Sequence, residues 1–132
     1  MRHPPHAGTR EQGVHLMGER LVYLNVGGVV FVTRRSTVEQ TAFFEAALRC
    51  RADDCDELFV DRDPTFFRYI LNWMRGVTQL PEDDAVLQEL AWEADYYGLV
   101  PMSNAIIRTK SRFSLLRTLH GVHSEMKTLS KK

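Results

Sequence analysis

Apolar and polar positions along the chain divide it into a series of short strands and helices. The runs LVYLNV (21–26) and VVFVT (29–33) are rich in β-branched and aromatic side chains, and Gly27 and Gly28 separate them. Two glycines between such runs are typical of a two-residue hairpin turn, because both turn positions take positive φ. The pattern therefore predicts a β-hairpin over 21–33.

Two short helices and a third strand are predicted next. Ser36 and Glu39 have the spacing of a capping box, which favours a short helical turn. Thr41 is a plausible N-cap for a second helix over the run TAFFEAALRC. A polar break, RADDCDE, then leads into a short strand at 58–61.

The segment FVDRDPTFFRYILNWMRG predicts a helix with two apolar faces. Asp63 and Pro64 form a helix-start signal, because the carboxylate can accept first-turn N–H groups and Pro64 has no N–H to lose. Two apolar rows follow at helical spacing: Phe67, Ile70, Leu71 and Met74, and then Phe66, Tyr69 and Trp73. One row can face the core, and the other a neighbouring element or subunit.

A further helix is predicted over 84–97. Pro81 and three acidic residues precede it, and Gly98 is placed to cap its end, with Pro101 just beyond. Its apolar face comprises Val86, Leu87, Leu90, Ala91 and Ala94. A last helix is expected from about Ser103. Beyond residue 110, apolar side chains recur at spacings that allow an amphipathic helix: Phe113, Leu116, Leu119, Val122, Met126 and Leu129.

Length and composition favour one domain. The chain has 132 residues, of which 44% are hydrophobic, and this is enough to bury roughly two-thirds of the unfolded surface. No apolar run approaches the ~18 residues of a membrane span, and residues 1–20 lack the apolar core of a signal peptide. We therefore expect a soluble, cytoplasmic protein. With only two cysteines, Cys50 and Cys55, reduced thiols are expected rather than a disulfide framework.

The zero net charge conceals a strong asymmetry. Residues 53–95 carry three Lys/Arg against twelve Asp/Glu, whereas residues 96–132 carry seven against one. Such blocks can attract each other within one chain or between copies, although charge blocks are more often solvated faces. A weaker alternative is that the basic tail contacts acidic lipid or nucleic acid; no specific nucleic acid is expected as a partner.

No catalytic motif is present in the sequence. His3, His6 and His15 lie in the aperiodic head and His120 and His123 in the tail, and none accompanies a Ser or Cys as a nucleophile and its base would. The run VGG lacks the lysine and the spacing of a phosphate-binding loop. We expect neither an enzyme nor a cofactor site.

Five blocks in order carry a family resemblance: LNVGG, FVT, FVDRDPTFFRYILNWMR, LP and LAWEADYYGL. The chain from about residue 21 to 108 resembles the potassium-channel tetramerisation (T1) domain of the BTB/POZ superfamily, and DRDP and EADYYGL look more like the soluble KCTD proteins than the channels. In one departure, Met74, Arg75 and Gly76 read one residue short of the family's Leu-Arg-x-Gly. The turn at 76–80 is therefore the least transferable part.

The resemblance implies an α/β (α+β) fold, a three-stranded sheet capped by helices, that assembles into a closed homo-oligomer of four or five subunits. We expect a mobile tail over 1–20, where the sequence has no periodicity, the T1/BTB domain over 21–109, and a basic tail over 110–132 whose spacing allows a helix. Interface residues are expected at the hairpin, the third strand's end and the second helical row: Asn25, Asp61, Arg62, Asp63, Tyr69 and Trp73. Alternatively, Asp61, Arg62 and Asp63 only cap a helix and form a local ion pair.

The resemblance also bears on metal. Some T1 domains bind interface zinc through a His and a set of Cys, with an adjacent Cys pair where this chain has Leu99-Val100-Pro101-Met102. We therefore expect no zinc. Cys50 and Cys55 alone are weak ligand candidates, better interpreted as a buried thiol and a loop residue.

Two functions follow from the resemblance. The first is an adaptor that presents a cullin ubiquitin-ligase scaffold; the second is an assembly scaffold for a channel or receptor that binds no cullin. From the size of the chain we expect no second folded substrate domain, and this expectation disfavours the adaptor. Cullin-binding relatives use an apolar groove beside the third strand, so the exposed members of one set are candidates for partner binding: Phe43, Phe44, Leu48 and Leu58. Alternatively, all four are core residues.

Overall fold

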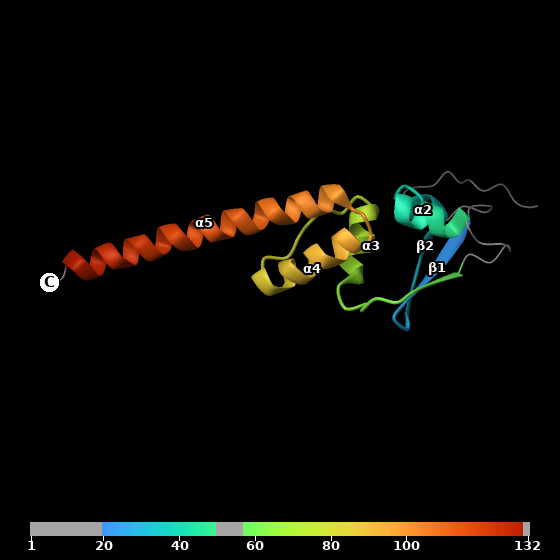
Figure 1. The fold of residues 1–132 in the computed structure, drawn as a ribbon, viewed down its shortest axis with the longest axis horizontal. Coiled ribbons are helices and arrows are strands. Elements are labelled where there is room, and N and C mark those ends of the chain that lie inside the picture. The colour runs from blue at the N-terminus through green and yellow to red at the C-terminus, as the bar shows by residue number, and fades with distance from the viewer. Residues whose placement is uncertain (1–19, 50–56, 131–132) are drawn as a thin grey trace, which may run out of the picture. The chain divides into compact units, whose positions relative to one another are not determined.

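The computed structural model describes residues 20–49 and 57–130, and for 122–130 only the backbone. Three strands and five helices follow in the order β1 (Leu21–Val26), β2 (Val29–Arg34), α1 (Arg35–Val38), α2 (Ala42–Arg49), β3 (Glu57–Val60), α3 (Phe67–Met74), α4 (Asp84–Tyr96) and α5 (Val100–Ser130), coloured along the chain in Figure 1. The chain divides into two units, residues 1–65 and 66–132. The expected α+β fold with a three-stranded sheet is confirmed.

The first unit is built on a mixed sheet of order β2-β1-β3. β1 pairs antiparallel with β2 through the predicted hairpin, and parallel with β3. Alternate residues of β1 point to opposite faces, so Val22, Leu24 and Val26 are fully buried while Tyr23 is 44% exposed. The sheet therefore has one core face and one outward face.

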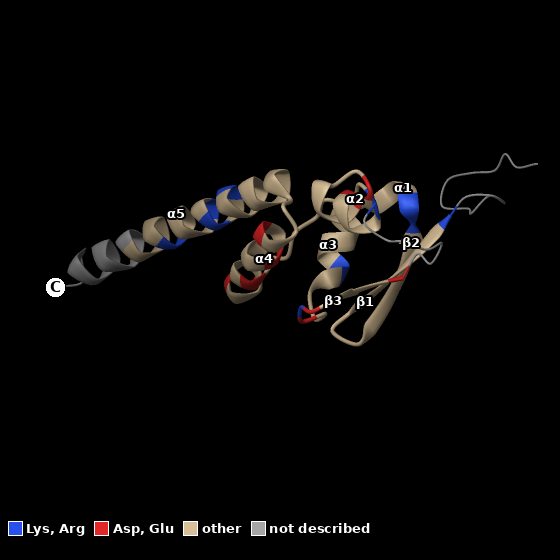
Figure 2. Ribbon diagram, turned by 45° about the vertical axis from the view of Figure 1, so that its right-hand side comes forward, with Lys and Arg blue, Asp and Glu red and all other residues tan. Residues whose placement is uncertain are grey.

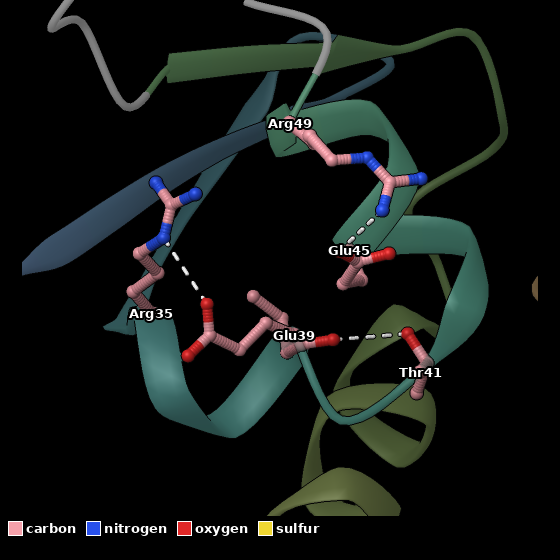
Figure 3. Close-up of polar contacts among 6 residues, drawn as sticks. Arg35, Glu39, Thr41, Glu45 and Arg49 are labelled. Carbon is pink, nitrogen blue, oxygen red and sulfur yellow. Dashed lines mark hydrogen bonds and ion pairs between the residues drawn. The ribbon is translucent and has the colours of Figure 1, made fainter.

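Helices α1 and α2 follow the hairpin. Thr41 caps α2 as predicted, because its Oγ1 accepts from the Phe44 N–H at 3.4 Å. The capping box is wrong: Ser36 lies inside α1, and Arg34 at the N-cap position makes no side-chain cap bond. Figure 3 shows the contacts that are present, namely the exposed i,i+4 pairs Arg35–Glu39 and Arg49–Glu45 and the Thr41 hydroxyl donating to Val38 O. Exposed pairs of this kind stabilise by only about 0.3–0.5 kcal/mol each.

Helix α3 begins later than the sequence predicts. It starts at Phe67, with Phe66 at the N-cap position in a non-helical conformation and without a side-chain cap, so Asp63 does not cap it. The reason is local: Asp63 Oδ1 already accepts the Thr65 N–H at 2.8 Å and the Thr65 hydroxyl. Asp63 thus stabilises a turn ahead of the helix. The first predicted row is confirmed as buried: Phe67, Ile70, Leu71 and Met74.

Helices α4 and α5 form an antiparallel pair in the second unit. Asp83 caps α4 by accepting the Val86 N–H at 3.0 Å. Gly98, at φ +70°, ends α4 as predicted, and the Leu99 N–H then donates to Ala94 O as in a Schellman motif. The side chains of Leu87, Leu90 and Ala94 are buried on one face of α4, as are Met102 and Ile106 on α5.

Helix α5 is longer than expected. It begins at Val100 rather than near Ser103, because Pro101 falls in the first turn, where a missing N–H costs nothing. It continues to Ser130 and passes the predicted boundary at 109/110 without a break. Within the described residues, no helix is both long enough and apolar enough to cross a bilayer.

Candidate protein-interaction surface

The hairpin turn and the loop after β3 meet at one corner of the first unit. The Gly27 N–H donates to Val60 O at 2.9 Å, and a Cβ added at Gly27 would collide with the backbone oxygen of Arg62. Gly27 also has φ +57°, which an L side chain rarely adopts. Glycine is therefore needed here for two separate reasons, and the runs LNVGG and DRDP are held together as one rigid corner.

The polar residues predicted for the interface line this corner. Asn25 Oδ1 accepts the Gly28 N–H at 2.8 Å and so fixes the hairpin turn. Asp61 and Asp63 are exposed, and Arg62 between them is half-buried. The two bonds from Thr65, of which the one from its hydroxyl is the stronger influence, hold the pKa of Asp63 below its ordinary value. The carboxylate therefore stays ionised at neutral pH.

The outward face of the sheet adjoins this corner and is apolar. Asn25 pairs with Val30 on β2 and with Phe59 on β3, and Tyr23 pairs with Val32. The exposed fractions of these apolar side chains are large: Tyr23 44%, Val30 50%, Val32 44% and Phe59 65%. We call Asn25, Asp61, Arg62 and Asp63 together with these four side chains the sheet surface.

The hydrophobic pattern of the sequence does not predict the apolar part of the sheet surface. The strands LVYLNV and VVFV are apolar on both faces, so alternation does not distinguish the inward from the outward residues. Glu57, which is exposed on β3, could have supplied the signal, because Phe59 lies two residues further on the same face.

The remaining predicted site residues lie elsewhere. Tyr69 and Trp73 are half-buried on α3, in the second unit, and the Arg68 guanidinium lies 4.8 Å from the centre of the Tyr69 ring. Of the four partner-binding candidates, Phe44, Leu48 and Leu58 are buried at 0%, 4% and 9% exposure. Only Phe43 is partly accessible, with its ring 5.0 Å from that of Phe44.

The prediction that Cys50 is a buried thiol and Cys55 a loop residue concerns positions outside the described residues. Within the part of the chain that the structure describes, no three His, Cys, Asp or Glu side chains gather as a metal site would require. His120 is exposed on α5.

A small α+β domain that exposes apolar side chains beside a rigid polar corner has the character of a protein-interaction domain. A family model described as BTB/POZ domain matches residues 22–106, more than half of the chain. The chain therefore belongs to the BTB/POZ family, and its relatives mark it as T1-type and KCTD-like. Domains of this family are generally interaction modules rather than enzymes.

The relatives are much longer than the matched region. SH3KBP1-binding protein 1 of Rattus norvegicus is 36% identical over 102 residues, which cover 71% of this chain and 14% of that protein. BTB/POZ domain-containing protein KCTD21 of Homo sapiens is 35% identical over 92 residues, covering 64% and 35%. FH protein interacting protein FIP2 of Arabidopsis thaliana is 36% identical over 94 residues, covering 65% and 32%. The chain thus spans about a third or less of these proteins.

Proposed function

We propose that this chain is a homo-oligomerisation and protein-interaction module in which the sheet surface receives a second copy of the chain. The observation that supports this most directly is the outward apolar patch of Tyr23, Val30, Val32 and Phe59 beside the polar corner. Contiguous exposed apolar side chains rimmed by charge are typical of protein contacts. Family membership supports self-association into a closed ring of four or five subunits.

In this proposal the corner supplies polar contacts and the patch supplies apolar area. Arg62 bridges to a carboxylate of the neighbouring copy, while Asp63 keeps its own turn closed. Asn25 and Asp61 complete the rim. Tyr69 and Trp73, on α3 in the second unit, are proposed as further interface residues. Since the corner is locked by Gly27, its charges are presented without a large ordering cost on association.

Light scattering on the full chain at micromolar concentration tests the proposal. The expected mass is four or five times that of the 15.2 kDa chain, and a stable monomer would overturn it. Arg62→Glu, which sets a third acid between Asp61 and Asp63, should weaken the assembly at least tenfold. Arg49→Glu is the matched control, because Arg49 is an exposed arginine with one carboxylate partner, Glu45, on α2. It should leave the mass unchanged.

A second candidate function is the presentation of a cullin scaffold, and the partial exposure of Phe43 favours testing it. Phe43 lies on the helix before β3, as the relatives' groove would require. A pull-down with a purified cullin N-terminal domain should then retain the wild type and lose Phe43→Asp, while both keep the same mass. The absence of binding at tens of micromolar would leave the alternative, a scaffold that assembles a channel or receptor.

A further inference from the structure

The α4–α5 pair is held by polar contacts at regular intervals. From one end to the other, Ser103 donates to Asp95, Lys110 to Gln88, and Arg117 pairs with Asp84 at 3.6 Å. The α5 members are seven residues apart, so they lie on one side of the helix. We call this side the seam. Each helix therefore has an outer face that its partner in the same chain does not cover.

The outer face of α4 is aromatic and acidic. Ala85, Glu89, Trp92 and Tyr96 are exposed and follow the spacing i, i+4, i+7 and i+11, which places them on one stripe. Trp92 is 59% and Tyr96 42% exposed. A large aromatic side chain left this open on a helix that buries its other face marks a contact surface.

The outer face of α5 is basic and aliphatic. Arg108, Arg112, Leu115 and Leu119 are exposed and repeat the same spacing of i, i+4, i+7 and i+11. Leu115 and Leu119 are each 58% exposed. Residues 96–121 contain four Lys/Arg and no Asp/Glu, and Figure 2 shows the contrast between the red residues of α4 and the blue ones of α5.

The two stripes match when the helices run parallel. Glu89 then lies opposite Arg112, Trp92 opposite Leu115, and Tyr96 opposite Leu119. One chain cannot make this contact, because its own α4 and α5 run antiparallel and meet through the seam. Two α5 stripes match each other less well, since each arginine would face an arginine in a parallel pair and a leucine in an antiparallel pair, in neither case a carboxylate.

We propose that neighbouring copies make a head-to-tail contact in which the α5 stripe of one copy packs in parallel on the α4 stripe of the next. The proposal rests on the proposed self-association and adds to it a second contact. Each copy offers one stripe and receives the other, so the contact is heterologous and repeats around a ring. The acidic and basic blocks of the sequence thereby become complementary surfaces.

Charge exchange tests the register on the full chain. Glu89→Arg and Arg112→Glu should each weaken the assembly at least tenfold in sedimentation equilibrium, and the double variant should return to within about threefold of the wild type. Arg49→Glu is the matched control: it makes the same charge change at an exposed arginine on α2, outside the seam and both stripes, and should leave assembly unchanged. A double variant no better than the worse single variant would overturn the proposal.

Tryptophan fluorescence of the full chain gives an independent measure, and the Trp92→Phe variant identifies the part of the emission that belongs to Trp92. Emission should shift to shorter wavelength as concentration drives assembly, and Arg112→Glu should delay the shift. If the wild type is monomeric, the proposed function fails as well. If Arg62→Glu dissociates the ring while Glu89→Arg and Arg112→Glu do not, only this contact fails. The full chain can also be tested for binding to anionic vesicles. If the wild type binds them and its assembly is insensitive to Arg112→Glu, the α5 stripe contacts a lipid surface and the proposed contact is overturned.

Discussion

The molecule contains two hairpins that are held together by opposite means. In the β-hairpin, backbone hydrogen bonds join β1 to β2 residue by residue, and the turn contacts the loop after β3. In the helical pair, each helix satisfies its own backbone, and only side chains join α4 to α5. The first hairpin has a fixed length, whereas the second lets α5 run on beyond α4.

Among the substitutions that test this difference, we expect the largest loss of stability at Gly27. Gly27→Ala should destabilise the chain by about 3 kcal/mol, because it adds a Cβ at positive φ and against the Arg62 backbone oxygen. Gly28→Ala, where nothing lies within 4 Å, should cost only roughly 1–2 kcal/mol for its φ. Urea unfolding of both variants measures the difference. Equal losses would mean that the close approach to Arg62 does not lock the corner.

Replacing glycine by alanine should change the free energy of unfolding in opposite directions at two glycines of the helical pair. Gly98→Ala should destabilise by about 1 kcal/mol, because Gly98 has φ +70° at the end of α4. Gly121→Ala should instead raise the helix content of α5, with a gain of about 0.5–1 kcal/mol, because Gly121 lies inside the helix with nothing within 4 Å. Circular dichroism during thermal unfolding distinguishes the two. A loss at Gly121 would show that this glycine serves a contact rather than the helix.

The β-hairpin, joined through its backbone, is easier to predict from the sequence than the helical pair, which is joined through side chains. The β-hairpin could be predicted because Gly27 and Gly28 are adjacent residues that readily adopt the positive φ of a two-residue turn. The start of α5 was missed because Pro101 is compatible both with the end of α4 and with a first turn. The proposed pairing of Trp92 with Leu115 could not be predicted from the sequence, because their exposure depends on which sides of α4 and α5 pack against each other. The prediction that Asp63 caps α3 is wrong for a local reason: the Asp63 carboxylate accepts hydrogen bonds from Thr65 instead of from the first turn of the helix.

Capping of α4 should have a moderate effect. Asp83→Ala should cost about 1 kcal/mol, because Asp83 accepts the Val86 N–H at the start of the helix. Asp84→Ala, one residue on, removes an exposed pair with Arg117 and an acidic side chain from the first turn but no cap, and should cost less, roughly 0.5 kcal/mol. Thermal unfolding of the two neighbours gives the comparison. Equal costs would contradict the assignment of Asp83 as the cap.

The smallest effect concerns acid sensitivity at the corner. Because Thr65 holds the pKa of Asp63 below its ordinary value, the ionised carboxylate stabilises the folded chain above that ordinary value. This contribution is lost as pH falls through the lowered, folded-state pKa. The melting temperature of Asp63→Asn, which does not titrate, should therefore lie below that of the wild type at neutral pH, and the gap should narrow in acid. Thr65→Val, which removes the stronger of the two bonds, should show a weaker pH dependence than the wild type. A gap that stays constant from neutral to acid pH would show that the turn does not depend on the charge of Asp63.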